Sequence, residues 1–272
     1  MNPELNFSPE LLETLRAQGL HNVVNQIEAK LGISLGAIDS VLNEFKTVTQ
    51  DALKHKVRKL AVIEDPVLVY GETGTGKEII ARALGANRNT DAKDGKRVGQ
   101  FVAINVAAIP KELVESTLFG YTKGSFTGAA IDKMGLIQHA GAGTLFLDEI
   151  GDLSFDLQAK FLRVLQDRKV RRVGSLDEEE VKCRFVCATH ANIEQLVKDG
   201  KFRQDLYARL STFVLTIPPL RERLQDIPAI MSALEPKFPT DKVDWSKQSL
   251  PLNVRSLQQM ARRFAVLQEL PQ

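Results

Sequence analysis

The sequence predicts an α/β fold in which helices flank a central parallel sheet and a small, shortened helical lid follows at the C-terminal end. Three observations support this prediction. Short apolar runs alternate with helical stretches from Pro66 onward, residues 71–77 form a glycine-rich segment between a predicted strand and a predicted helix, and the strand pattern stops after Pro218 and Pro219. Short, wholly apolar strands separated by helices are typical of a parallel sheet that is buried on both faces.

The predicted strands are 67–70, 101–105, 144–148, 183–189 and 213–217, and the clearest predicted helices are 77–84, 157–166, 221–234 and 254–268. Residues 1–50 are expected to form a helical appendage, with Ser8 as an N-cap and Pro9 in the first turn. Residues 51–219 then form the α/β domain and residues 220–272 the lid. The polar segment 87–99 is expected to be a surface loop.

Composition narrows the class of protein. The 272 residues are 43% hydrophobic and 26% charged, as in ordinary globular proteins, and the net charge of +2 implies no broad nucleic-acid or membrane surface. Cys183 and Cys187 lie on one predicted strand, roughly 13 Å apart, which is too far for a disulfide. We expect buried thiols in a reducing compartment. No long apolar stretch or signal-like start is present, so a cytoplasmic location is expected.

The glycine-rich segment has the G-x-x-x-x-G-K pattern of a phosphate-binding loop. Glycines let backbone N–H groups approach phosphate oxygens, and a lysine reaches the terminal phosphates. The residues of this segment expected at the nucleotide site are Gly71, Glu72, Thr73, Gly74, Thr75, Gly76, Lys77 and Glu78. Glu78 follows in place of the usual Ser or Thr that contacts Mg²⁺, so the metal must depend more on other ligands.

Those ligands are expected at the end of the apolar run 144–148. Asp148 is expected to hold Mg²⁺, and Glu149 to orient and polarise the water that attacks the γ-phosphate. A pair of surface carboxylates at a strand end is the alternative interpretation. Because the carboxyl ends of parallel strands meet at one sheet edge, both carboxylates should face the phosphate loop.

Other strand-end residues are candidates for the same site. Asn105 is expected beside Glu149, where its amide would keep the carboxylate from water; the alternative is a strand-end amide that satisfies loop backbone. Thr189 and His190 end the fourth strand and are expected to sense the γ-phosphate, although a lone histidine is more often structural. Arg203 and Arg209 are candidates to stabilise phosphoryl charge in a neighbouring subunit's site. Their alternative is a solvated helix face with a salt bridge to Asp205.

A glycine-bracketed loop lies between the two nucleotide motifs. Glycines and small residues suit a protruding tip, and Phe126 offers an exposed apolar contact. A partner-binding loop is the functional interpretation and an ordinary hairpin turn the alternative. The residues expected to contact a partner are Gly124, Ser125, Phe126, Thr127, Gly128 and Ala129.

This loop closely resembles the G-A-F-T-G-A loop of the sigma-54-dependent transcriptional activators, the bacterial enhancer-binding proteins, which are AAA+ P-loop NTPases. The resemblance runs from about Pro66 to Asp226 and includes Glu78 after the phosphate-loop lysine. It also covers the segments 143–153, 157–166 and 218–223.

The resemblance implies a ring-forming ATPase, with a hexamer expected, that uses ATP and Mg²⁺ to remodel sigma-54 RNA polymerase holoenzyme. It implies that Phe126 and Thr127 contact sigma-54 and that Asn105 is the switch asparagine. Thr189 and His190 match the first sensor, and Arg203 and Arg209 match the arginine fingers that act across subunits.

Three departures accompany the resemblance. Ser125 replaces the usual alanine of the loop. The segment 250–257 resembles an eroded W-P-G-N-V-R-E-L motif in which Arg255 matches the second sensor, and the preceding stretch looks shortened. No helix-turn-helix is expected within the sequence, which ends at Gln272. Two alternatives therefore remain open: a related ATPase acting on a different client, and a regulatory partner subunit of a full-length activator.

Overall fold

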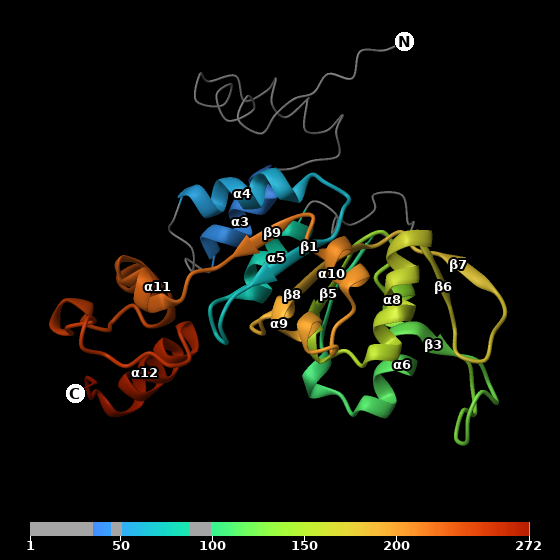
Figure 1. Cartoon of the computed structure of the whole chain (residues 1–272). Helices are drawn as coiled ribbons and strands as arrows, with labels where there is room; N and C mark the ends of the chain where they lie inside the picture. The colour runs from blue at the N-terminus through green and yellow to red at the C-terminus, as the bar shows by residue number, and fades with distance from the viewer. Residues whose placement is uncertain (1–34, 45–50, 87–98, 272) are drawn as a thin grey trace, which may run out of the picture.

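A computed structural model of the chain describes residues 35–44, 51–86 and 99–271 (Figure 1). The predicted helix beginning at Ser8 and most of the predicted loop 87–99 lie outside these residues. Five strands form a wholly parallel sheet in the order β2 (Phe101–Asn105), β5 (Thr144–Asp148), β8 (Arg184–Thr189), β1 (Val67–Tyr70), β9 (Val214–Thr216). The predicted parallel sheet is confirmed, and each predicted strand is present to within a residue at either end.

Helices cover both faces of the sheet, because the strand residues alternate between two apolar clusters. Val67 and Val69 pack with α3 (Leu35–Glu44), α4 (Asp51–Ala61) and α5 (Lys77–Gly85) on one face. Leu68 faces the opposite way, toward the layer formed by α6 (Lys111–Phe119), α8 (Phe155–Asp167) and α10 (Gln204–Leu210). The central strands β1, β5 and β8 are buried on both faces, which explains their mainly apolar sequence, whereas the edge strands β2 and β9 are partly exposed.

Ile38 of α3 is fully buried together with Val57 and Ile80. Helix α3 lies within the predicted appendage 1–50, yet this side chain belongs to the core that covers the sheet. The three-part division of the chain stays a prediction, and the described part of its first segment is packed onto the second.

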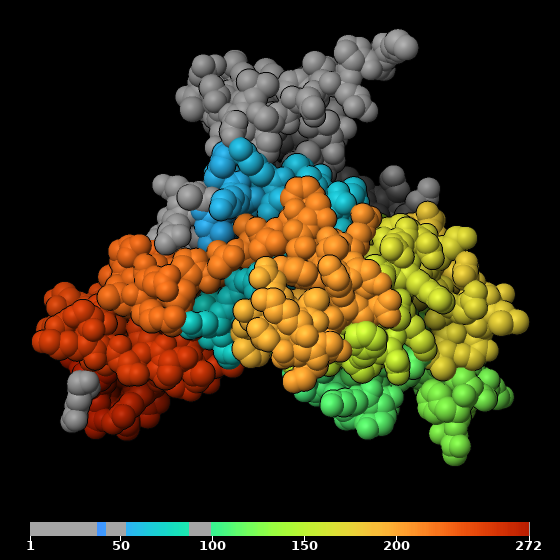
Figure 2. Space-filling view, in the orientation of Figure 1, coloured from blue at the N-terminus to red at the C-terminus, as the bar shows by residue number. Residues whose placement is uncertain are grey.

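Two small antiparallel hairpins lie at one end of the molecule. One joins β3 (Gly120–Tyr121) to β4 (Lys133–Met134), and the other joins β6 (Lys169–Arg171) to β7 (Glu178–Glu180). Figure 2 shows the first hairpin, in green, projecting from the body of the protein. Four further short elements lie between β2 and β9 in the sequence: η1 (Val106–Ala108), α7 (Leu136–His139), η2 (Ile150–Asp152) and α9 (Ile193–Lys198).

The lid lies at the opposite end and has an apolar core of its own (Figures 1 and 2). It consists of η3 (Leu220–Glu222), η4 (Leu224–Asp226), α11 (Ile227–Leu234), η5 (Thr240–Lys242) and α12 (Val254–Leu267). The predicted helix 221–234 is therefore too long at its start. Pro228 sits in the first turn of α11, where its missing N–H is harmless, and two 3₁₀ turns precede it.

Cys183 and Cys187 are both buried, unbridged thiols in the same apolar cluster, as predicted. Burial raises the pKa of the Cys187 thiol, which keeps it protonated and unreactive. Among the helices that the structure describes, none is both long and apolar enough to cross a membrane.

Candidate functional site

The predicted phosphate loop connects β1 to α5 at the carboxyl edge of the sheet. Gly74 and Gly76 adopt positive φ angles of 79° and 103°, which glycine tolerates without strain. A Cβ atom at Gly74 would lie 2.0 Å from the carbonyl oxygen of Leu252, so the lid also requires glycine here. The resulting loop wraps the N-terminal end of α5, where helix dipole and backbone N–H groups favour an anion.

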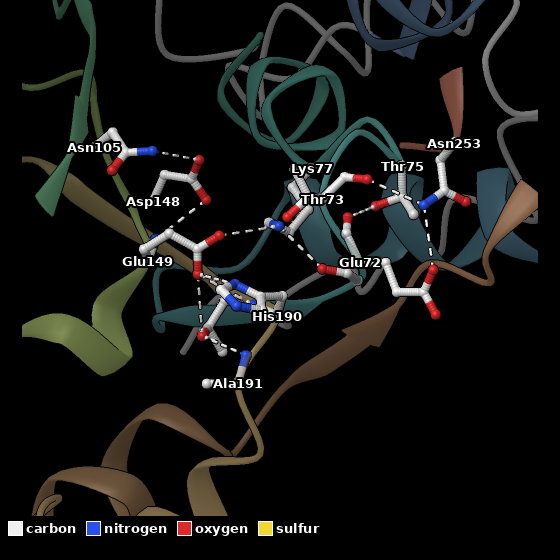
Figure 3. Close-up of polar contacts among 12 residues, drawn as sticks. Glu72, Thr73, Thr75, Lys77, Asn105, Asp148, Glu149, His190, Ala191 and Asn253 are labelled. Atoms are coloured by element: carbon white, nitrogen blue, oxygen red, sulfur yellow. Dashed lines mark hydrogen bonds and ion pairs between the residues drawn. The ribbon is translucent and has the colours of Figure 1, made fainter. Parts of the chain in front are cut away.

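Lys77 opens α5, and its side chain is 93% buried, since only 7% of its surface is exposed. Its Nζ donates to the carbonyl of Gly71 at 3.0 Å and to Oε1 of Glu149 at 3.4 Å. The two predicted nucleotide motifs are therefore in direct contact (Figure 3). The lysine remains at the inner surface of the loop, where phosphate oxygens would arrive.

Glu149 follows β5 in a left-handed conformation, with φ 56° and ψ 53°. Its Oε2 accepts hydrogen bonds from the Thr189 hydroxyl at 3.4 Å and the His190 backbone N–H at 3.2 Å, and lies 2.8 Å from His190 Nδ1. Burial acts to raise the pKa of Glu149, but the charge of Lys77 and the contacts with His190 outweigh it and lower the pKa. Glu149 is thus held ionised among cationic and donor groups.

Asp148 occupies the end of β5, directly opposite Asn105 in the β2–β5 register. Its Oδ1 accepts the Glu149 backbone N–H at 3.1 Å, and its Oδ2 accepts from Asn105 Nδ2 at 3.3 Å. Burial raises the pKa of Asp148 even though the charge of Lys77 opposes the rise, and neighbouring Glu149 raises it further. A partly buried carboxylate whose charge is under-compensated favours a cation.

Asn105 lines the same cavity as Glu149, but its amide donates to Asp148 and not to Glu149 in the described structure, and its switch role stays a prediction. The parallel register explains this difference, because it pairs Asn105 with the last residue of β5, and Glu149 comes one residue later in a left-handed turn. Thr189 and His190 occupy the place beside Glu149 that was predicted for the amide.

A cavity of about 520 Å³ opens between the phosphate loop, the strand ends and the lid. Its lining combines both predicted motifs with α12: Thr73, Gly74, Gly76, Lys77, Glu78, Ile79, Arg82, Asn105, Asp148, Glu149, Val254, Arg255 and Gln258. Arg255 is exposed at this cavity, where its predicted role as second sensor would place it. The eroded lid motif therefore still delivers an arginine to the site.

Glu78 and Asp148 are the two carboxylates of the cavity that could serve as Mg²⁺ ligands besides Glu149. Glu78 is paired with Arg82 one helical turn away at 2.7 Å, so its charge is already compensated. Within the described ranges no group of three or more His, Cys, Asp or Glu side chains could hold a metal ion. Asp148 as a single protein carboxylate, in a cavity open to phosphates and water, suits Mg²⁺, which usually keeps water and phosphate ligands.

The two predicted arginine fingers lie at the two ends of α10, and neither is among the residues that line this cavity. Arg203 precedes the helix, pairs with Asp205 at 2.8 Å and lies 5.5 Å from the Phe155 ring centre. Arg209 is exposed in the last turn. The salt bridge to Asp205, which was the alternative interpretation, is therefore present for Arg203, and the arginine-finger role of both residues stays a prediction. Neither arginine lines the cavity of its own chain.

The glycine-bracketed loop forms the tip of the β3–β4 hairpin. Phe126 is 44% exposed and packs edge-on against Tyr121, with ring centres 5.0 Å apart. Thr127 is exposed, whereas Ala129 is buried. The tip is closed by a hydrogen bond from the Gly124 N–H to the Ala129 carbonyl, and Gly124 and Gly128 have positive φ angles. An aromatic and a hydroxyl group thus project together from a tight turn.

Three polar residues at the site received no predicted role. Asn253 and Arg221 contact Glu72 of the phosphate loop, and the buried Arg223 donates to the carbonyl of Thr75. Because of these contacts the Glu72 carboxylate faces the lid, away from the cavity. The motif 218–223 and the eroded motif 250–257 contained these residues, but one sequence gave no sign of their partners.

Comparison with known proteins places this site in a family. The family described as Sigma-54 interaction domain matches residues 44–216. The response regulator protein PilR of Pseudomonas aeruginosa is 42% identical over 231 residues, which cover 80% of this chain and 50% of PilR. The DNA-binding transcriptional regulator NtrC of Escherichia coli is 43% identical over 213 residues, 74% of this chain and 44% of NtrC.

A solved structure supports the same placement. The crystal structure of NtrX from Brucella abortus in complex with ATP superposes with a TM-score of 0.69 at 27% identity, covering 97% of this chain and 58% of NtrX. The chain spans about half the length, or less, of the curated relatives PilR and NtrC. The fold is that of the AAA+ P-loop NTPases, and the chain belongs to the sigma-54 interaction domain family of sigma-54-dependent transcriptional activators.

Proposed function

We propose that the chain hydrolyses ATP and uses the energy to remodel sigma-54 RNA polymerase so that transcription can begin. One observation carries the proposal: Lys77, Asp148 and Glu149 converge on a single cavity at the phosphate loop. The family match and the ATP complex of NtrX support the nucleotide as ATP. The exposed pair Phe126 and Thr127 supplies the contact with the client.

In the proposed reaction the γ-phosphate displaces Glu149 from Lys77. The lysine then neutralises phosphate charge, and Glu149, still held by Thr189 and His190, orients a water molecule for in-line attack. A Mg²⁺ ion held through Asp148 would supply charge compensation for the β- and γ-phosphates. Water adds to the γ-phosphorus, the bond to the bridging oxygen breaks, and ADP and phosphate leave.

Activity is proposed to require a ring, for which a hexamer fits the family. Arg203 and Arg209 lie outside the cavity of their own chain, so they are available to a neighbouring subunit's phosphate. A site completed across a subunit boundary is inactive in an isolated subunit. Hydrolysis per subunit should therefore rise with protein concentration.

The proposed output is movement of the β3–β4 hairpin against sigma-54. Gly124 and Gly128 have no neighbouring atoms within 4 Å of an added Cβ, so both glycines of the tip face open space. Phe126 gives apolar contact area and Thr127 a hydrogen-bonding group at the same tip. Such a tip suits a protein client better than a small molecule.

The test compares the unmodified chain with Thr127→Ala. ATPase activity is titrated against protein concentration, and binding to purified sigma-54 is measured with ADP and aluminium fluoride, a mimic of the transferring phosphoryl group. We expect concentration-dependent turnover in both proteins and loss of sigma-54 binding in the variant. Ser116→Ala, at a half-buried position of α6, is the control that should bind normally. Retained binding by Thr127→Ala would refute the loop assignment, and absence of turnover would refute the ATPase.

A further inference from the structure

The side chain of Asn253 makes three hydrogen bonds, two of which join the lid to the phosphate loop. The residue is 1% exposed, and its Oδ1 accepts the Leu220 backbone N–H at 2.6 Å. Its Nδ2 donates to the Thr73 carbonyl at 3.0 Å and to Oε2 of Glu72 at 3.3 Å (Figure 3). One amide therefore bridges the start of the lid, the start of α12 and the phosphate loop.

The backbone of Asn253 has an unusual conformation, with φ 53° and ψ −127°. Residues other than glycine rarely adopt this region, and they keep it only where surrounding contacts impose it. If the position served only as a turn before α12, glycine would satisfy it better. The hydrogen bonds of the Asn253 side chain must therefore stabilise the structure by more than the backbone strain costs.

Arg221 makes a second connection to the same part of the phosphate loop. Its Nη1 and Nη2 donate to the two carboxylate oxygens of Glu72 at 2.8 and 2.7 Å. This two-point geometry fixes direction as well as distance. The pairing with Arg221 and the hydrogen bond from Asn253 lower the pKa of Glu72, which keeps the carboxylate charged.

Backbone contacts place the same junction at the nucleotide cavity. The N–H of Val254, the first residue of α12, donates to the Gly74 carbonyl at 3.0 Å. Arg255 is the next residue and lines the cavity. Any change in the junction therefore moves Arg255 relative to the phosphate loop.

We propose that Glu72, Arg221 and Asn253 form a lid latch, in which Arg221 and Asn253 are positioning residues that set the phosphate loop and Arg255 at the distance needed to bind ATP. The proposal rests on the proposed ATPase activity. With the latch closed, the loop and the lid arginine bind the triphosphate together. With the latch broken, the lid moves off the loop and ATP binds more weakly, while the hydrolytic group Glu149 stays in place.

Two variants test the latch in the full chain. Arg221→Ala removes an exposed side chain, and Asn253→Gly relieves the backbone strain while deleting the amide. KM for ATP and kcat are measured at one saturating protein concentration. We expect KM to rise about 3- to 10-fold in each variant, with kcat within about 2-fold, since the lost contacts do not touch Glu149. The control Arg263→Ala breaks an exposed ion pair with Glu269 elsewhere on the lid and should leave both constants unchanged.

Hydrogen exchange of the Val254 amide, measured without nucleotide, gives a readout that does not depend on activity. We expect both variants to exchange this amide faster than the unmodified chain and the control. A normal KM together with normal exchange in Arg221→Ala and Asn253→Gly would overturn the latch. Normal KM and higher melting temperature in Asn253→Gly would also overturn it, because the residue would then be only a strained turn. If the unmodified chain failed to hydrolyse ATP, the proposed function would fail, while the exchange rates would still decide the latch.

Discussion

Lys77 and Glu149 are in contact through Nζ and Oε1, which lie 3.4 Å apart in a largely buried environment. The first residue is expected to bind phosphate and the second to activate water, so each at present compensates the charge of the other. In the proposed reaction, phosphate competes with Glu149 for the lysine, and we expect its arrival to release the carboxylate. This one ion pair would then link nucleotide binding to activation of the hydrolytic group.

Glu149→Gln should separate ATP binding from hydrolysis. The amide keeps the size of the side chain but cannot take a proton from water, and we expect hydrolysis to fall about 10²- to 10⁴-fold. ATP affinity should stay the same or increase, because Lys77 no longer has to break an ion pair with a carboxylate before it binds phosphate. Turnover and equilibrium binding of ATP measure the two effects. Glu115→Gln, at an exposed pair with Lys160, serves as the control, and an equal loss of binding and turnover would contradict the assignment.

Arg209→Ala should abolish hydrolysis without preventing ATP binding, if the arginine acts in a neighbouring subunit as proposed. We expect a loss of about 10³-fold or more in turnover. The decisive measurement mixes this variant with Lys77→Ala, which cannot bind phosphate but keeps its arginine. Active sites formed between the two kinds of subunit should restore part of the activity.

The same mixing design applies to Arg203→Ala, and Arg262→Ala at an exposed lid position is the control that should remain active alone. A mixture that assembles yet stays inactive would show that Arg209 acts within its own subunit. The in-chain pairing of Arg203 with Asp205 predicts a difference between the two arginines. Arg203 must leave this partner before it reaches a neighbour, whereas Arg209 is exposed with no such ion pair among the described contacts.

Ser125→Ala should stabilise the folded tip of the β3–β4 hairpin. The Ser125 Oγ is buried and has no hydrogen-bond partner among the described residues, and its Cβ packs closely over Gly174. Removing a buried, unsatisfied hydroxyl should stabilise the folded tip by about 1 kcal/mol of free energy. Hydrogen exchange at the Gly124 amide, which closes the tip, should slow by about 5-fold. Ser116→Ala, whose hydroxyl has a partner, should not slow it, and faster exchange in Ser125→Ala would contradict the argument.

The sequence predicts those parts of the fold that a short stretch of neighbouring residues is enough to identify. Unbroken apolar runs identify the five strands, and the glycine and lysine pattern identifies the phosphate loop. Asp148 and Glu149 follow because strand ends share one sheet edge. The glycines and small residues around Phe126 and Thr127 predict a protruding loop tip, and the structure has these two residues exposed at the tip of the β3–β4 hairpin.

The contacts of Asn105 and Glu72 could not be predicted in this way, because they depend on geometry between distant segments. A single-residue difference in register decides whether Asn105 meets Asp148 or Glu149. Glu72 turns toward the lid because Arg221 and Asn253 come from a segment whose eroded sequence hid its packing. Propensity and spacing are local quantities, so neither contains this information.

Asp148→Asn should stabilise the protein in metal-free buffer and at the same time remove its Mg²⁺-dependent hydrolysis. Burial and the charge of Glu149 raise the pKa of Asp148 in the folded state, so its ionised form opposes folding. Ionised Asp148 begins to destabilise the folded protein as the pH rises above 3.8, the ordinary pKa of an aspartate. The destabilisation is complete once the pH exceeds the raised pKa of Asp148 in the folded state. At pH 7.5 the neutral amide should therefore raise the melting temperature, because it removes an ionised group whose charge opposes folding.

The gain should shrink as the pH is lowered toward 4, since Asp148 itself then becomes neutral. Thermal melts at several pH values in the presence of a chelator measure the difference in melting temperature between Asp148→Asn and the unmodified chain. Turnover with added Mg²⁺ measures the loss of function. Asp156→Asn is the control: that carboxylate lies in the first turn of α8, where it favours the helix dipole, so its removal should give no gain. A lower melting temperature for Asp148→Asn at pH 7.5, or unchanged Mg²⁺-dependent turnover, would show that the charge of Asp148 is already compensated within the protein.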